Sequence, residues 1–133
     1  MKFTVKRIIS AFIISLTLMT TTVLAKSTLM TYQGWAIRGK ASIQNFTISS
    51  TTAITLTHTN DSFAYNYPGT DYMKITYQKK NSLGIYSNTS YSTTTHGTGT
   101  FTYNCSLSSG TYRLYFNTLD TGTSADISGN VKG

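Results

Sequence analysis

The chain has 133 residues, which is enough for one domain with a modest core and too few for two. Its 11 Lys and Arg stand against four acids, all of them Asp, for a formal net charge of +7. A single Cys excludes an internal disulfide framework and a multi-Cys metal site, and four carboxylates leave little material for paired-carboxylate catalysis.

The N-terminal segment has the pattern of a secretory signal peptide. Three bases precede an apolar run and a short polar stretch: Lys2, Lys6, Arg7, 8–19 and 20–25. Ser and Thr interrupt the run, which is also shorter than the roughly 20 residues of a membrane-spanning helix. We therefore expect a signal peptide over 1–25 that is cleaved after Ala25. The mature chain, 26–133, is expected to be a secreted, extracellular bacterial protein with no transmembrane segment.

Cleavage after Ala25 would change the charge of the chain. It would leave eight Lys and Arg against the four Asp, a net charge of +4. The remaining bases are scattered: Lys26, Arg38, Lys40, Lys74, Lys79, Lys80, Arg113 and Lys132. Surfaces that bind nucleic acid gather Lys and Arg on one face, so we expect no nucleic-acid partner. Weak attraction to an anionic surface, such as a bacterial wall polymer or lipid headgroups, stays open.

Several segments of the mature chain alternate apolar and polar side chains, which is the pattern of half-buried strands. In chain order they are 43–48, 52–58, 72–78, 85–91, 100–107, 111–118 and 125–131. Turn residues at 80–84 and 108–110 separate neighbouring segments, and the Ser/Thr-rich stretch 87–100 is either a loop or a loose edge strand. The pattern predicts an all-β protein: a single small antiparallel β-sandwich of about seven to eight strands, immunoglobulin-like or jelly-roll-like.

Three segments in the second half of the chain occur in a recognisable order: 77–84, 97–103 and 107–114. A strand–turn–strand unit followed by Gly110-Thr111-Tyr112 resembles the accessory β-sandwich modules of secreted bacterial proteins, namely the pre-peptidase C-terminal domains and related jelly-roll binding domains. The resemblance covers about 72–133 and implies a non-catalytic role. Some of these modules bind calcium through acidic loops, but the four Asp here are single and dispersed, so no ion is carried over.

Asp120-Thr121-Gly122 matches the signature of aspartic proteases. That chemistry needs two carboxylates that share a proton, and too few residues follow the motif to form the strands that should come after it. Asp-Thr-Gly is also good turn chemistry. We therefore interpret the motif as a turn.

Cys105 and the two His could suggest a thiol nucleophile activated by imidazole. Cys105 shares the strand parity of Tyr103 and Leu107, so we expect it to face the core as a small apolar side chain. His58 is expected near the end of a strand and His96 in a flexible stretch. Two single His do not supply the three or four ligands of a metal site, so we expect neither a metal nor a cofactor and no catalytic residues.

The candidate ligand-binding residues lie in a stretch rich in Tyr, Asn and Asp. They are Tyr65, Asn66, Tyr67, Asp71 and Tyr72, with Trp35 as a further candidate ring. An aromatic ring stacks on the apolar face of a sugar while amides and carboxylates bind its hydroxyls, and Tyr suits such a site because it is amphipathic. Alternatively, the Tyr-rich stretch is one face of a strand before a Pro-Gly turn, and Trp35 belongs to the core, the usual place for a lone Trp.

These observations favour a secreted, non-catalytic β-sandwich that serves as an extracellular binding or surface-interaction module. The expected partner is a cell-surface glycan or an anionic wall polymer. The alternative function is a secreted antibacterial or membrane-active protein, or the immunity partner of one, because the chain is small and basic. An enzyme is the least favoured of the three, and no pattern in the sequence indicates an oligomeric state.

Overall fold

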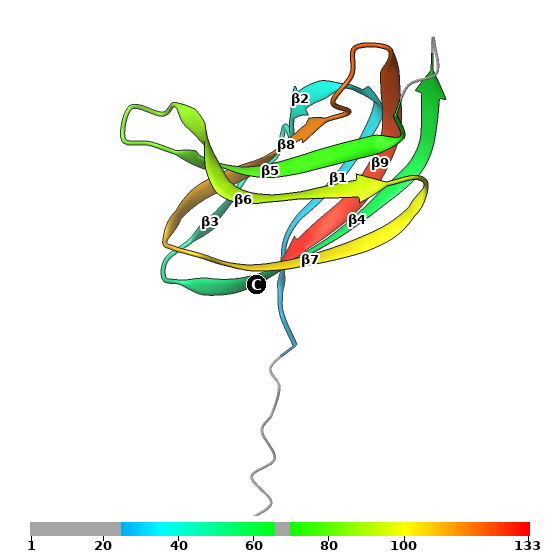
Figure 1. Cartoon of the computed structure of the whole chain (residues 1–133). Helices are drawn as coiled ribbons and strands as arrows, with labels where there is room; N and C mark the ends of the chain where they lie inside the picture. The colour runs from blue at the N-terminus through cyan, green and yellow to red at the C-terminus, as the bar shows by residue number, and fades with distance from the viewer. Residues whose placement is uncertain (1–24, 66–69) are drawn as a thin grey trace, which may run out of the picture.

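The computed structural model describes residues 25–65 and 70–133, and it folds them into nine strands (Figure 1). The strands are β1 (Thr28–Ile37), β2 (Gly39–Ala41), β3 (Phe46–Ile48), β4 (Thr52–Tyr65), β5 (Tyr72–Lys80), β6 (Tyr86–His96), β7 (Gly99–Leu107), β8 (Gly110–Asn117) and β9 (Thr123–Lys132). Within the described ranges, no helix has the length and apolar character needed to cross a membrane. The predicted signal peptide lies outside these ranges, except for Ala25.

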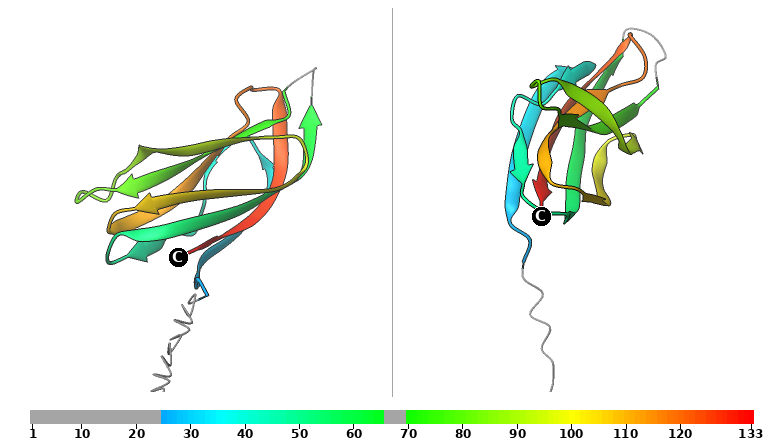
Figure 2. Two further views of the ribbon diagram at one scale, coloured as in Figure 1. Left: turned by 60° about the horizontal axis from the view of Figure 1, so that its bottom comes forward. Right: turned by 90° about the vertical axis from the view of Figure 1, so that its left-hand side faces the viewer.

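The strands form two antiparallel sheets that lie face to face (Figure 2). The first has the order β1-β9-β4-β7, and the second has the order β2-β8-β5-β6, with β3 also paired to β8. The chain crosses repeatedly from one sheet to the other, in the double Greek-key order of a jelly roll. The predicted antiparallel β-sandwich is therefore confirmed, and of its two expected forms the structure has the jelly roll.

The seven predicted strands correspond to β3 through β9, and β1 and β2 were not predicted. β1 escapes the period-two pattern because Gly34 and Ala36 interrupt its apolar alternation after Tyr32. β2 has only three residues, too few to show a period. The Ser/Thr-rich stretch 87–100 contains the edge strand β6 and the start of β7, so the edge-strand alternative is correct.

The core lies between the inner faces of the two sheets. Its fully buried apolar side chains come from both sheets: Ile54, Leu56, Met73, Ile75, Leu107, Leu114, Ile127 and Val131. Alternation leaves the opposite face of each strand to polar side chains, as the sequence predicts for strands that are wet on one side. The two ends of the described chain lie side by side, because the backbones of Ser27 and Gly133 exchange hydrogen bonds of 2.9 and 3.0 Å.

The two predicted turns are present and use the expected residues. Between β5 and β6, the Asn81 Oδ1 atom accepts hydrogen bonds from the backbone N–H groups of Leu83 and Ile85, and Gly84 has a φ of 81°. That conformation favours Gly because it has no Cβ. The short turn before β8 carries the chain from one sheet to the other rather than closing a hairpin, since β7 and β8 belong to different sheets.

Candidate functional site

Trp35 lies on a bulge of the edge strand β1. The pairing of β1 with β9 shifts between Gly34, opposite Ile127, and Ile37, opposite Ala125. One residue of β9 therefore faces two residues of β1, which is the arrangement of a β-bulge. The Trp35 side chain is 67% exposed. The core interpretation of Trp35 is thus wrong, because the bulge turns this ring away from the interior.

The carboxylate of Asp126 holds the bulge in place. Its Oδ1 atom accepts a hydrogen bond of 2.9 Å from the backbone N–H of Ala36, and its Oδ2 atom accepts one of 3.2 Å from the Ser62 hydroxyl. Ala36 has a φ of 51°, a left-handed conformation that is costly for a residue with a Cβ. A strained residue persists only where its surroundings hold it. Asp126 therefore fixes the backbone on which Trp35 is presented.

Beside Trp35 the sandwich opens into a groove between β1 and the segment that follows β2. The groove has a volume of about 440 Å³. Its floor consists of apolar and aromatic side chains that also belong to the core: Tyr32, Ile37, Phe116 and Ile127. Gly34 leaves room for the Ile37 side chain in this floor, because a Cβ at position 34 would come within 2.9 Å of it. The groove thus reaches from the surface to the edge of the core.

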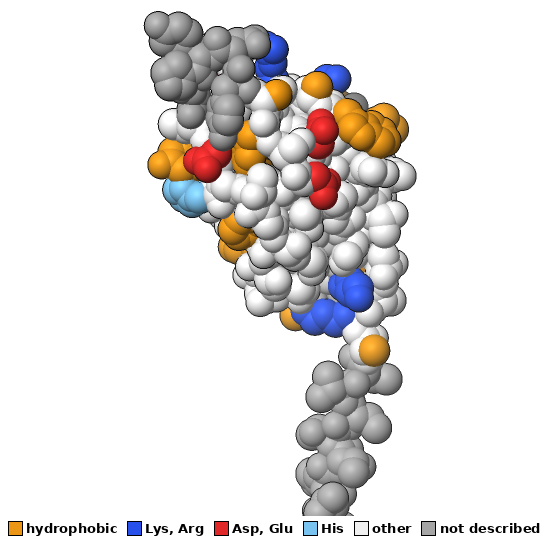
Figure 3. All heavy atoms as spheres, turned by 90° about the vertical axis from the view of Figure 1, so that its right-hand side faces the viewer, with side chains coloured by type: hydrophobic (Ala, Val, Ile, Leu, Met, Phe, Trp, Pro, Cys, Tyr) orange, Lys and Arg blue, Asp and Glu red, His pale blue; other side chains and the backbone are white. Residues whose placement is uncertain are grey.

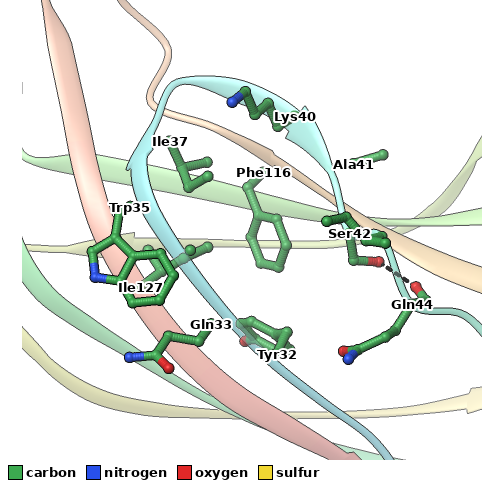
Figure 4. A pocket seen from close by; sticks show the side chains of 12 residues that line it. Tyr32, Gln33, Trp35, Ile37, Lys40, Ala41, Ser42, Gln44, Phe116 and Ile127 are labelled. Carbon is green, nitrogen blue, oxygen red and sulfur yellow. Dashed lines mark hydrogen bonds between the residues drawn. The ribbon is translucent and has the colours of Figure 1, made fainter.

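Polar side chains surround this apolar floor (Figure 4). Gln33 lies beside Trp35 on one wall, and Ser42 and Gln44 lie on the opposite wall, with Lys40 at one end. The Ser42 hydroxyl donates to the Gln44 backbone carbonyl at 2.7 Å, so the side-chain amide of Gln44 takes no part in this bond. Amides and a hydroxyl around an aromatic floor form the mixture that binds small polar molecules with apolar faces.

Behind the floor, a chain of buried hydrogen bonds crosses the interior. The Tyr32 hydroxyl lies 2.7 Å from His58 Nδ1, and His58 Nε2 lies 2.7 Å from Asn60 Oδ1. The Asn60 amide nitrogen donates to the Thr95 hydroxyl and to the Gly97 carbonyl, each at 2.9 Å. Because that nitrogen is the donor, Asn60 Oδ1 must accept from His58 Nε2–H, and in the neutral imidazole Nδ1 then accepts from the Tyr32 hydroxyl.

This arrangement requires the neutral form of His58. Burial lowers the pKa of His58, although the hydrogen bond to Asn60 and the charge of Asp61 act in the opposite direction. His58 lies in the interior of β4 and is buried, so the expectation that it stands near a strand end is wrong. The imidazole also stacks against Phe116, at 5.9 Å between ring centroids. His58 therefore supports the groove floor and does not line the groove.

The structure brings together only part of the predicted Tyr-rich site. Asn66 and Tyr67 lie outside the described residues, and Tyr65 ends β4, where its backbone pairs with that of Thr123. Asp71 accepts a backbone hydrogen bond of 2.8 Å from Gly97 through its carbonyl. Tyr72 begins β5, and its ring meets that of His96 edge to face at 4.2 Å.

Asp71 and Tyr72 do not line the groove beside Trp35. β6, which pairs with Tyr72, is the edge of its sheet farthest from β2. Trp35 belongs to the opposite edge of the sandwich, formed by β1 and β2. Among the described candidates, Trp35 therefore lies in a different region from Asp71 and Tyr72, and the groove residues Gln33, Lys40 and Gln44 were missed. Their only sequence signal is their nearness to Trp35 along the chain.

Asp120 is a structural residue of the loop before β9. Its carboxylate accepts hydrogen bonds of 2.9 to 3.0 Å from the backbone N–H groups of Thr70 and Gly122 and from the hydroxyls of Thr70 and Thr123. These bonds, that from Thr123 foremost, lower the pKa of Asp120. The turn interpretation of Asp-Thr-Gly is thereby confirmed, because this carboxylate is occupied in holding the loop.

Cys105 faces the interior as expected. It is half-buried and packs against the core, and burial raises the pKa of its thiol. A raised pKa disfavours the thiolate, which is the nucleophilic form. Among the described residues, no group of three or more His, Cys, Asp or Glu side chains is placed to hold a metal ion.

No protein-family model matches the chain, and no curated protein matches its sequence. In structure it is similar to the pre-peptidase C-terminal domain of the collagenase from Bacillus anthracis. The TM-score is 0.51, the match covers 79% of this chain and 90% of that domain, and the sequence identity is 18%. At this identity the similarity shows the fold alone. The predicted weak resemblance to these accessory β-sandwich modules is confirmed.

Proposed function

We propose that the protein is a non-catalytic, extracellular binding module that holds a surface carbohydrate in the groove beside Trp35. The observation that carries the proposal is an exposed Trp, fixed by a hydrogen-bonded bulge, above an apolar floor ringed by amides. A pyranose ring has an apolar face that would stack on the indole and hydroxyls that would meet Gln33 and Gln44. An exposed indole ring leaves apolar surface in contact with water in the free protein. A ligand that covers the ring removes this surface from water, which favours binding.

We propose a non-catalytic role because the two most reactive side chains, those of Asp120 and Cys105, have structural roles. Asp120 has its oxygens occupied by the loop, and Cys105 is a protonated, inward-facing thiol. The structural neighbour is likewise a domain attached to an enzyme rather than its peptidase part, as its name states. Export would rest on the signal-peptide pattern of 1–25, and the protein recovered from the culture medium should begin at Lys26 by mass spectrometry.

The test of the binding proposal compares two exposed aromatic side chains. Trp35→Ala should weaken binding of the purified protein to a bacterial cell-wall fraction about tenfold or more, as removal of a central aromatic contact does. Tyr91→Ala removes an exposed ring from β6, at the far edge, and should leave binding unchanged. Equal effects of the two substitutions, or no binding by the unaltered protein, would contradict the proposal.

A second candidate function is contact with a membrane surface. Ile43 is completely exposed, and two exposed apolar side chains, Ile43 and Trp35, line the same groove as Lys40. Trp favours the membrane–water interface, and a base beside it favours anionic lipids. In this case the protein should release dye from anionic vesicles, and Ile43→Ser should reduce the release. Intact vesicles at high protein concentration would count against it.

A further inference from the structure

The outer face of the β1-β9-β4-β7 sheet carries uncharged polar side chains in register. Two rows of four cross the whole sheet: Thr31–Asn130–Thr57–Thr102 and Gln33–Ser128–Thr59–Thr100. We call these eight side chains the polar lattice. They lie on the outer face because the residues between them, such as Met30, Leu56 and Ile127, face the core, although the Oδ1 atom of Asn130 is buried and has no hydrogen-bond partner. Neighbouring strands lie about 4.8 Å apart, so each row spans about 14 Å.

Charge is confined to the ends of this face. The next row toward the termini contains Lys132, and there the Lys26 ammonium donates to the Thr55 hydroxyl at 2.8 Å. Beyond the other row stand two carboxylates: Asp126, whose two oxygens already hold Ala36 and Ser62, and Asp61, which is exposed on the bulge of β4. In Figure 3, which shows this side of the molecule, the middle of the face is white, Asp side chains lie in its upper part, and Lys and Arg side chains lie at its lower and upper ends.

This distribution of charge discriminates between classes of polymer. A polyanion laid over the polar lattice would find no base among its eight side chains, because Lys and Arg lie only beyond its ends and carboxylates stand at one of them. Its charges over the lattice would therefore lose hydration without gaining partners. An uncharged polymer has no charges to desolvate. The polar lattice therefore favours a neutral chain over an anionic wall polymer.

The polar lattice retains the capacity to bind hydroxyl groups. The Thr59 and Thr100 hydroxyls are 2.9 Å apart, so one donates to the other and the second keeps its own donor. Within the described part of the chain, the side chains of Thr57, Thr102 and Gln33 have no hydrogen-bond partner, so water solvates them. Exchange of that water for sugar hydroxyls preserves the hydrogen bonds, while the Thr methyl groups offer apolar contact.

The polar lattice is continuous with the groove. Gln33 belongs to both, and Trp35 follows it two residues later on the same strand. We propose that this face of the sheet, extending from Trp35 across β9, β4 and β7, binds an extended, uncharged polysaccharide. The inference rests on the proposed function and specifies its ligand: a neutral chain that extends beyond the groove.

The test uses neutral and anionic polymers side by side. The purified protein is sedimented with microcrystalline cellulose and with chitin, and its mobility is measured in native gels that contain polygalacturonate. We expect retention on a neutral polymer that high salt does not reduce. Thr102→Glu, at the β7 end of its row, should lower the affinity about tenfold or more, because the polymer would bury an unpaired carboxylate.

Matched variants separate the outcomes. Thr94→Glu places the same change at an exposed position of β6 in the other sheet and should bind as the unaltered protein does. Thr100→Glu repeats the test if the Thr102 variant does not fold. Preference for polygalacturonate, or equal binding by Thr102→Glu and Thr94→Glu, overturns the inference while a Trp35-dependent groove stands. Failure to bind the cell-wall fraction and all three polymers overturns the proposed function with it.

Discussion

His58 shows how one buried polar residue couples the strands around the groove floor. It links Tyr32 of β1 to Asn60 of its own strand, and Asn60 reaches the β6–β7 connection through Thr95 and Gly97. A buried network of this kind is stabilising only while each member is satisfied. Protonation of His58 would place a second N–H on Nδ1, toward the Tyr32 hydroxyl, and would introduce a charge into the interior.

We therefore expect the protein to lose stability in mild acid. Because burial lowers the pKa of folded His58, the unfolded chain binds the proton more readily, and stability falls as the pH drops below the unfolded value of about 6.5. The melting temperature measured from about pH 7.5 to about pH 5 should show this fall. His58→Gln, which cannot titrate, should flatten it, whereas His96→Gln, at an exposed position, should not. An unchanged slope in His58→Gln would refute the assignment.

At the scale of the element, the β1 bulge connects fold and function. It is the point at which a strand of the first sheet stops pairing regularly, after which the chain passes through Arg38 into β2 of the second sheet. The Arg38 guanidinium donates to the Thr121 carbonyl at 3.0 Å, and the Arg38 carbonyl accepts from the Thr118 backbone at 2.8 Å. The corner is thus pinned on both sides, so the two walls of the groove keep their separation.

Removal of the Asp126 carboxylate should loosen this element. In Asp126→Ala, the Ala36 N–H loses its acceptor, and the free energy of unfolding should fall by about 1 kcal/mol. Carbohydrate binding should weaken as well, because Trp35 would no longer be held in one position. Asp126→Asn keeps an oxygen acceptor and should retain most of both properties. Urea unfolding and ligand titration measure the two effects; equal losses in the Ala and Asn variants would show that charge matters rather than the hydrogen bond.

At the scale of the whole molecule, the sandwich was predictable and the groove was not. Alternation of apolar and polar residues is a local property of the sequence, so the strands over 100–107 and 111–118 can be predicted from their own residues. The groove depends on side chains that are distant in sequence: Tyr32 and Trp35 from β1, the segment after β2, Phe116 from β8 and Ile127 from β9. Their meeting follows from the order of strands in two sheets, which no single segment encodes.

The same distinction explains the errors on Trp35 and His58. Hydrophobicity alone places a lone Trp inside, and His58 was expected near a strand end because the visible alternation covers only 52–58, whereas β4 runs to Tyr65. A bulge held by Asp126, 90 residues away from Ala36, turns Trp35 outward. Hydrogen bonds with Tyr32 and Asn60 hold His58 inside. Both reversals depend on partners across the sheet. At both residues, polar contacts rather than apolar burial decide where the side chain lies.

Trp35 also offers a direct measurement of the central claim, that this groove edge is the binding site. It is the single Trp of the chain, so fluorescence excited where Tyr does not absorb reports this residue alone. Titration with cello- and chito-oligosaccharides should shift its emission to shorter wavelength and protect it from acrylamide quenching, because a stacked sugar would displace water from the exposed indole. Emission and quenching that stay unchanged when an oligosaccharide is demonstrably bound would contradict the account.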